Sequence, residues 1–203
     1  MPEAGIMRMT LAARAAELAA VIASARATDR SGKALDAERA VLHCLDTLRG
    51  VRERGGSLFL AGNGGSAAVA SHSATDFVNV GRIRAMTLHE SSLITCMSND
   101  FGYQNAFAQV LSAYARPADV LIAISSSGQS PNIRNAAART RELGGTVITL
   151  SGFAPGNPLR ELGDLNLWVD SSDYGLVELG HQFLLQNIAD RLRLENAMKN
   201  DER

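Results

Sequence analysis

LIAISSSGQSPNI, residues 121–133, joins an apolar run to four serines and one glycine within a span of six residues. The apolar run predicts a buried strand, and residues 132–142 have the pattern of a helix. The first N–H groups of a helix have no partner within it, and the helix dipole adds partial positive charge there. A strand that opens through such a turn into a helix is therefore a candidate phosphate site.

The side chains of this turn favour a small phosphomonoester. Hydroxyl groups of Ser125, Ser126, Ser127 and Ser130 can donate to phosphate oxygens. Gly128 has no Cβ that would block close approach of the backbone. The turn contains no Lys or Arg, so it is not a nucleoside triphosphate loop of the GxxxxGK[ST] type. We expect a sugar phosphate here, and the alternative is a serine-rich turn that binds nothing.

Composition limits the class of protein. The 203 residues are 46% hydrophobic and 20% charged with a formal net charge of −1, which is typical of one soluble globular domain. No run rich in Lys and Arg occurs, so we expect no direct binding of nucleic acid. No apolar run approaches the ~20 residues of a membrane span. Cys44 and Cys96 match neither a metal site nor a disulfide framework, and we expect a cytoplasmic protein with reduced thiols.

The order of hydrophobic patterns predicts an α/β fold. Amphipathic helices are expected over residues 9–27 and 34–54, with a break at 28–32. Five short apolar strands then alternate with helices, at residues 57–61, 85–88, 120–124, 146–150 and 165–169, followed by a last helix at 175–196. Such alternation predicts a parallel sheet that is covered on both faces.

We therefore expect a single domain over residues 1–203. Two N-terminal helices would form an arm at residues 1–54, and a doubly wound five-stranded parallel sheet would form the α/β core at residues 55–196. Ligands in such sheets bind at the carboxyl ends of strands, near the point where the strand order reverses.

A second turn follows the first strand of the predicted core, with the sequence GNGGS at residues 62–66. Gly64 and Gly65 permit close approach of a ligand to the backbone, and the amide of Asn63 can bond to a sugar hydroxyl or carbonyl. Since both turns follow strands of the same predicted sheet, we expect them to contribute to one site.

Four motifs, taken in order, resemble the sugar isomerase (SIS) domain family. They are LAGNGGSAA (60–68), SNDFGYQNAFAQ (98–109), ISSSGQSPNI (124–133) and YGLVELGH (174–181). The resemblance covers about residues 35–195 and is greatest to the phosphoheptose isomerase branch, which interconverts sedoheptulose 7-phosphate and a heptose 7-phosphate. It implies a flavodoxin-like three-layer fold, a ketose–aldose isomerase of that or a related sugar phosphate, and a homotetramer with sites completed at subunit interfaces.

The resemblance also assigns roles to residues. The four serines would hold the phosphate, and the sugar would contact Asn63, Gly64, Gly65, Ser66, Asn99, Asp100 and Glu178. The zinc ligands of the family, a His, a Glu, a Gln and a His, correspond to His72, Asp76, Glu178 and Gln186. Of these, Asp76, Glu178 and Gln186 are the candidates for catalysis. Zinc is the cofactor that the resemblance implies, and we expect no nucleotide cofactor.

Three of the four positions depart from the family pattern. Asp76 is one methylene shorter than Glu, Glu178 stands in place of Gln, and Gln186 cannot transfer a proton near neutral pH as His can. One imidazole and two carboxylates still form a conceivable divalent-metal set. Glu178 could replace Asp76 as the general base, because a carboxylate next to another carboxylate should have a raised pKa.

Other interpretations stay open at this point. His72 could simply pack on its helix, and Glu178 could form an ion pair with an arginine. The altered catalytic positions would also suit a different reaction on a related sugar phosphate. An interpretation from another class is a non-catalytic SIS protein that binds a phosphosugar or a protein partner and acts as a regulator or adaptor, as replication-initiator-associating proteins do.

Overall fold

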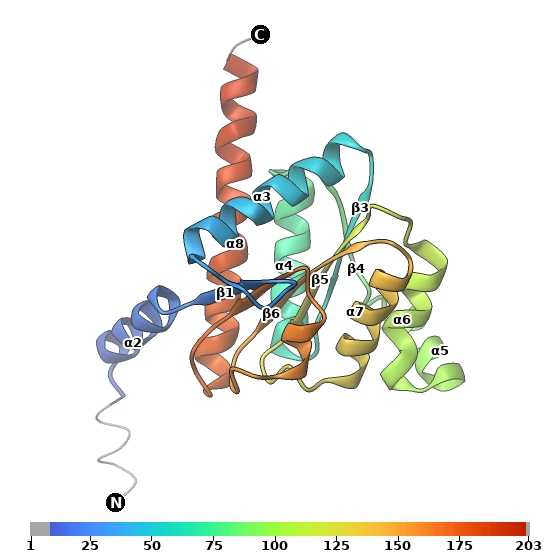
Figure 1. Ribbon diagram of the computed structural model, residues 1–203, viewed down its shortest axis with the longest axis horizontal. Coiled ribbons are helices and arrows are strands. Elements are labelled where there is room, and N and C mark those ends of the chain that lie inside the picture. The colour runs from blue at the N-terminus through green and yellow to red at the C-terminus, as the bar shows by residue number, and fades with distance from the viewer. Residues whose placement is uncertain (1–8, 202–203) are drawn as a thin grey trace, which may run out of the picture.

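The computed structural model describes residues 9–201 of the chain, and its centre is one seven-stranded sheet (Figure 1). The strand order is β2–β1–β7–β6–β5–β3–β4. The strands are β1 (Arg26–Asp29), β2 (Ala34–Leu35), β3 (Ser57–Ala61), β4 (Arg84–Thr87), β5 (Val120–Ser125), β6 (Thr146–Ser151) and β7 (Leu165–Trp168). Strands β3 to β7 are parallel, which confirms the α/β fold and the five parallel strands of the core.

The total of five strands was too low, because the segment between the two N-terminal helices forms a hairpin. Strand β1 pairs antiparallel with both β2 and β7, and it extends the sheet beyond β7. The Asp29 carboxylate accepts hydrogen bonds from the N–H groups of Ser31 and Lys33, and Gly32 has a φ of +82°. These local bonds make a tight turn where the sequence pattern indicated only a break in helix.

Seven α-helices and one 3-10 helix are present in the part of the chain that the structure describes. They are α2 (Leu11–Ala23), α3 (Ala37–Glu53), α4 (Gly65–Asn79), α5 (Ser91–Phe101), α6 (Tyr103–Tyr114), α7 (Pro131–Glu142), α8 (Tyr174–Asp201) and the 3-10 helix η1 (Pro158–Glu161). The expected N-terminal helices are α2 and α3, both shorter than predicted. Side chains of Thr10 and Asp36 cap them by accepting backbone hydrogen bonds.

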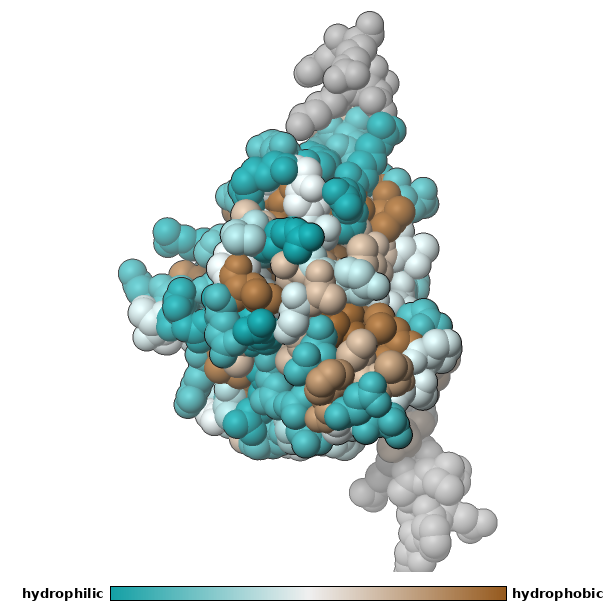
Figure 2. Space-filling view, turned by 90° about the vertical axis from the view of Figure 1, so that its right-hand side faces the viewer, coloured by the Kyte–Doolittle hydropathy of each residue, from teal (hydrophilic) through white to brown (hydrophobic). Residues whose placement is uncertain are grey.

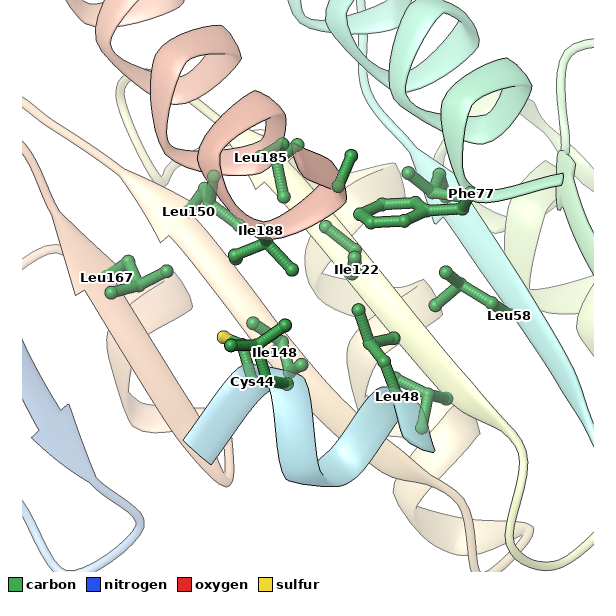
Figure 3. Packing of buried hydrophobic residues seen from close by; sticks show 14 of the residues in the cluster. Cys44, Leu48, Leu58, Phe77, Ile122, Ile148, Leu150, Leu167, Leu185 and Ile188 are labelled. Carbon is green, nitrogen blue, oxygen red and sulfur yellow. The ribbon is translucent and has the colours of Figure 1, made fainter. Parts of the chain in front are cut away.

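The helices cover both faces of the sheet, so the molecule has three layers. Helices α3, α4 and α8 pack on one face, where Cys44, Phe77 and Leu185 meet strand residues in a single apolar cluster (Figure 3). Helices α6 and α7 pack on the other face through residues such as Phe107 and Ile133. Burial of a side chain of this size contributes about 1.5–3 kcal/mol, so this two-sided core holds the ends of the strands in fixed positions.

Helix α2 lies apart from the core. None of its residues is buried, and Leu11 is 88% exposed. Its Arg14 guanidinium lies 2.6 Å from the Asp173 carboxylate, just before α8 begins. Figure 1 shows α2 projecting from the side of the sheet that carries the hairpin. No helix in the described range 9–201 has the length and hydropathy needed to cross a membrane.

The topology places two turns side by side at one edge of the sheet. Strands β3 and β5 are neighbours, but the chain leaves β3 through α4 toward β4 and leaves β5 through α7 toward β6. The two connections therefore diverge on opposite sides of this strand pair. Such a reversal of strand order opens a crevice at the carboxyl ends of the strands, and both predicted turns lie at it.

Candidate functional site

A cavity of 260 Å³ lies where β3 and β5 end. Its lining combines the two turns with the start of α8: Asn63, Gly64, Gly65, Ser66, Ile124, Ser125, Ser126, Ser127, Ser130, Tyr174 and Glu178. This volume lies near the lower end of the range of small-molecule sites, which suits a compact polar ligand. The structure thus brings together the four serines, the GNGG turn, Ser66 and Glu178 that the sequence singled out.

The serine turn presents hydrogen-bond donors toward this cavity. The hydroxyl of Ser125 bonds to that of Ser130 at 3.1 Å, and the Ser127 hydroxyl accepts from the N–H of Gln129 at 3.2 Å. The Ser126 hydroxyl is buried and has no partner among the described residues. Helix α7 begins at Pro131, and none of the described side chains caps it. The first turn of α7 thus keeps free N–H groups for an anion.

Gly128 is required by the shape of the serine turn. Its φ is +66°, in the left-handed region that favours glycine. A Cβ here would lie 2.8 Å from the Cβ of Asn157 and closer still to its Oδ1. Asn157 is 1% exposed, and its amide nitrogen donates to Ser151 Oγ at 3.0 Å and to the Ala154 carbonyl at 3.0 Å. The buried amide of Asn157 therefore supports the turn from behind.

Two asparagines join the turns to each other. Asn63 Nδ2 donates to Asn132 Oδ1 at 2.9 Å, and Asn132 Nδ2 donates back to Asn63 Oδ1 at 2.8 Å. The Tyr103 hydroxyl also donates to Asn63 Oδ1, at 2.7 Å. Most of the hydrogen-bonding capacity of Asn63 therefore goes to holding the β3 and β5 turns together. Sequence reasoning missed Asn132 and Tyr103, although both lie in the motifs that carry the family resemblance.

Glu178 lies against Gly65 at the start of α4. A Cβ on Gly65 would lie 2.6 Å from Glu178 Oε1 and even closer to Oε2, so the carboxylate occupies the space that a side chain would fill. Gly64, just before it, has a φ of +54° and a ψ of −124°, a conformation suited to glycine. Tyr174, one turn before Glu178 on α8, also lines the cavity, and its ring packs edge-on against Phe153.

The other predicted catalytic residues meet elsewhere. His72 Nε2 lies 3.3 Å from Gln186 Oε1 and 3.2 Å from Asp76 Oδ2, and Gln186 Nε2 donates to Asp190 Oδ1 at 3.4 Å. None of these four residues lines the cavity. They form a polar contact between α4 and α8, farther along both helices.

The expectation that Glu178 lies beside Asp76 was wrong, and the direction of the helices explains it. Helices α4 and α8 both begin at the carboxyl edge of the sheet and run the same way (Figure 1). Residues that lie equally far from the start of each helix are therefore neighbours: Glu178 lies against Gly65, and Gln186 lies against His72. Asp76 follows Gly65 by eleven residues, which is about 16 Å along a helix.

This arrangement does not fit a zinc site within one chain. Around His72, the contact between α4 and α8 offers one carboxylate, Asp76, and one neutral amide, Gln186. The Asp190 carboxylate contacts the Gln186 amide instead, and Glu178 is engaged at the other end of α4. Zinc in proteins takes at least three good N, S or carboxylate ligands. In residues 9–201, no group of three or more His, Cys, Asp or Glu side chains could hold a metal ion. The ligand roles of His72, Asp76, Glu178 and Gln186 remain predictions.

Asn99 and Asp100 lie on α5, away from the cavity lining. Asn99 Nδ2 donates to Asp100 Oδ1 at 2.9 Å, and Cys96 Sγ lies 3.7 Å from Asp100 Oδ2. Both asparagine and aspartate side chains are exposed. Within this chain they bond to each other, and their contact with a sugar remains a prediction from the family resemblance.

Two histidines support the site from behind. His181 is fully buried on α8, and its Nε2 donates to the Ser151 carbonyl at 3.1 Å. Burial lowers the pKa of His181 to about 4, so this imidazole is neutral and does not exchange protons near neutral pH. His89 Nε2 lies 3.0 Å from the Gly62 carbonyl oxygen, and burial lowers the pKa of His89 as well. Both side chains brace backbone near the cavity.

Comparison with known proteins agrees with this geometry. The family model described as SIS domain matches residues 16–152. A phosphoheptose isomerase from Mycobacterium tuberculosis is 38% identical over 144 residues, which cover 68% of this chain and 73% of the relative. One from Burkholderia pseudomallei is 39% identical over 137 residues, covering 64% and 69%. The solved phosphoheptose isomerase from Neisseria gonorrhoeae has 28% identity and a TM-score of 0.72, with 76% of this chain and 86% of that one covered.

Proposed function

This chain belongs to the SIS domain family and to the phosphoheptose isomerase group within it, and we propose that it isomerises sedoheptulose 7-phosphate or a closely related sugar phosphate. The observation that carries this proposal is that one small cavity has a serine turn on one side and the Glu178 carboxylate on the other. The first can bind a phosphate, and the second can move a proton. Ketose–aldose isomerisation of a phosphosugar needs both.

The serine turn would hold the phosphate with neutral donors. Hydroxyl groups of Ser125, Ser126, Ser127 and Ser130, together with free N–H groups at the start of α7, surround one end of the cavity. No Lys or Arg is among the lining residues that the structure describes. Neutral donors and a helix terminus suit one terminal phosphate, since a triphosphate would bring more charge than they can balance.

Glu178 is the residue that we assign as the general base. It would take a proton from C1 of the ketose to form an enediol, and returning the proton to C2 would give the aldose. The oxygen at C2 gains a proton and the oxygen at C1 loses one, so the step needs no external oxidant or reductant. Tyr174 lines the same cavity and offers a hydroxyl that can donate to the substrate carbonyl.

Turnover measurements test this assignment directly. The wild-type protein should convert sedoheptulose 7-phosphate to an aldose phosphate, as followed by NMR, and Glu178→Gln should lose at least ~100-fold in kcat, the scale of a lost general base. Glu142→Gln is a matched control, since Glu142 pairs with Arg139 on the surface of α7. Full activity of Glu178→Gln would exclude Glu178 as the base.

We extend the proposal to assembly as a homotetramer. Helix α2 has no buried residue, and on α8 the side chains of Leu179 and Phe183 are more than half exposed. A second exposed set includes Met86, Phe101 and Tyr114 on the side of the molecule where α5 and α6 lie. Figure 2 looks onto that side and shows hydrophobic residues grouped near its centre. Exposed apolar groups of this kind are typical of surfaces that contact another protein.

The assembly can be measured by light scattering. The mass of one chain is 21.6 kDa, and we expect about four times this value for the wild type. Phe183→Glu should lower the mass because it places a charge in an apolar contact. A monomeric wild type would exclude the tetramer, and it would leave the phosphate site and Glu178 in place within the single chain. The proposal includes a cytoplasmic location, for which free Cys44 and Cys96 are suitable.

A second candidate function is phosphosugar binding without turnover. The contact of Gln186 with His72 favours it, because a glutamine amide cannot carry a proton where the family resemblance places a histidine. Such a protein would act as a regulator or adaptor. Binding of sedoheptulose 7-phosphate with no product, in the same NMR experiment, would support this second function over the first.

A further inference from the structure

A second hollow, with a volume of 350 Å³, lies between the β1–β2 hairpin and the loop that follows β6. Its lining residues are Thr28, Arg30, Ser31, Gly32, Pro155, Gly156, Asn157, Arg160 and Glu161. None of them lines the cavity of the serine turn. They include two arginines, two hydroxyl residues and one carboxylate, and a second carboxylate, Asp164, pairs with one of the arginines, Arg30.

Trp168 is not among the lining residues, but two arginines lie on its ring, and one of them, Arg160, lines the hollow. The guanidinium carbon of Arg160 is 5.5 Å from the ring centroid, and that of Arg26 is 5.4 Å from it. Arg26 is directly opposite Trp168 in the β1–β7 ladder, and Arg26 and Thr28 share one face of β1 because side chains alternate along a strand. The hairpin thereby places positive charge over the same indole that Arg160 covers.

The two guanidinium groups act on each other. Burial and the nearby charge of Arg26 lower the pKa of Arg160. Arg26 has a carboxylate partner in Asp170, at 3.5 Å, and Arg30 has one in Asp164, at 3.3 Å. For Arg160 the described residues supply no carboxylate, and its Nη1 donates to the Pro155 carbonyl. Arg160 therefore carries a partly buried charge that no carboxylate within residues 9–201 neutralises.

Two buried donors, one on Arg160 and one on the indole that it covers, also have no acceptor among the described residues. They are Arg160 Nε and Trp168 Nε1, and Trp168 is only 2% exposed. Buried donors without partners are rare in folded proteins, and each one calls for an explanation such as a bound water or ion. An anion in the hollow would accept from Arg160 and also balance its charge, whereas a water molecule would not balance the charge.

We propose that this hollow is a second binding site, for the phosphate group of a small phosphorylated metabolite, with Arg160 and Arg30 as its cationic contacts. A guanidinium presents paired N–H donors that match phosphate oxygens, and the Thr28 hydroxyl can add a further bond, whereas the Ser31 hydroxyl donates to Asp29. The hollow is large enough for the rest of a small metabolite beyond its phosphate. Glu161 at its rim would disfavour a ligand with additional acidic groups there.

The single tryptophan gives this site its own signal. Trp168 is the only Trp in the sequence, so its indole N–H yields one resonance in a ¹H–¹⁵N spectrum of the full-length protein. Titration with inorganic phosphate at constant ionic strength should shift this resonance in a saturable manner. We expect millimolar affinity, because phosphate is only part of the proposed ligand. Sodium chloride alone should not reproduce the shift.

Four variants determine where the signal originates. Arg160→Gln should weaken phosphate binding by at least ~10-fold, and Arg30→Gln, an exposed change that leaves the core intact, should weaken it by several-fold. Arg116→Gln is the control, since this exposed arginine lies just before β5 and does not line the hollow. Ser130→Ala impairs only the serine turn and should leave the indole response unchanged.

Two results would overturn the proposal. One is an indole resonance that does not respond to phosphate, or that responds equally in wild type, Arg160→Gln and Arg30→Gln. The other is a response that Ser130→Ala abolishes, because the signal would then come from phosphate at the serine turn. The measurement needs no turnover, so it stands independently of the isomerase assignment.

Discussion

Replacing Gly65 by alanine places a methyl group where the Glu178 carboxylate lies. A Cβ there would be 2.6 Å from Oε1 and closer to Oε2, whereas Cβ atoms essentially never approach other atoms within 3.0 Å. The carboxylate would therefore have to move by about 1 Å, and a misplacement of ~1 Å at a reacting group costs roughly 100-fold in rate. That factor corresponds to about 2.7 kcal/mol of transition-state free energy.

The same substitution should not weaken the fold. Gly65 is the first residue of α4, and its φ is not positive. Alanine in a helix is favoured over glycine by roughly 0.5–1 kcal/mol, since it has less backbone freedom to lose. We therefore expect Gly65→Ala to lower kcat/KM for the sugar phosphate by about 100-fold while the melting temperature stays equal or rises.

A matched control and a double variant test whether the loss of activity arises from the Glu178 carboxylate. Gly156→Ala adds the same methyl group at a position with no described atom within 4 Å of the new Cβ, so its activity should equal that of the wild type. In a Glu178→Gln background, Gly65→Ala should cost little more, because both changes act through one carboxylate. The reasoning is refuted if Gly65→Ala retains more than a third of wild-type kcat/KM. It is also refuted if the loss in the double variant equals the product of the losses in the two single variants.

Three further predictions concern stability and metal. The pKa of His181 is about 4 in the folded protein and 6.5 ordinarily, so the unfolded chain binds a proton first as the pH falls. The free energy of unfolding should therefore drop by about 3 kcal/mol from pH 7 to 4, as measured by urea titration. His181→Gln should show a smaller drop. Gly128→Ala should destabilise the fold by about 2–4 kcal/mol, seen as a lower urea midpoint, because it strains a φ of +66° and displaces Asn157. Treatment with EDTA should leave turnover unchanged, since His72 and Asp76 meet only an amide oxygen, and a loss that zinc restores would refute this.

The sequence was sufficient to predict the core of the fold. Five apolar segments that alternate with helices became β3 to β7, because fully buried parallel strands have no polar face to obscure the pattern. The two turns could be placed for a related reason, since glycine and serine clusters stand out where such strands end. The sequence did not predict the β1–β2 hairpin, because its strands have only four and two residues and β1 depends on pairing with β7.

The site was harder to predict than the fold, since it depends on which residues meet across helices. Spacing along α8 indicated that Glu178 and Gln186 share a face, but it could not show that α4 runs beside α8 in the same direction. That direction separates Glu178 from Asp76 and pairs Gln186 with His72. The reciprocal amide bonds of Asn63 and Asn132 join residues 69 positions apart, and no local pattern signals such a contact.

The central claim is that Glu178 moves a proton on a phosphosugar bound at the serine turn. Its most direct test is proton NMR of sedoheptulose 7-phosphate with catalytic amounts of protein in D₂O, with wild type and Glu178→Gln compared side by side. We expect the wild type to place deuterium at C2 of the aldose phosphate and, through the reverse step, at C1 of the ketose. Glu178→Gln should show neither change although it still broadens the substrate signals. Equal exchange by both proteins would contradict the account.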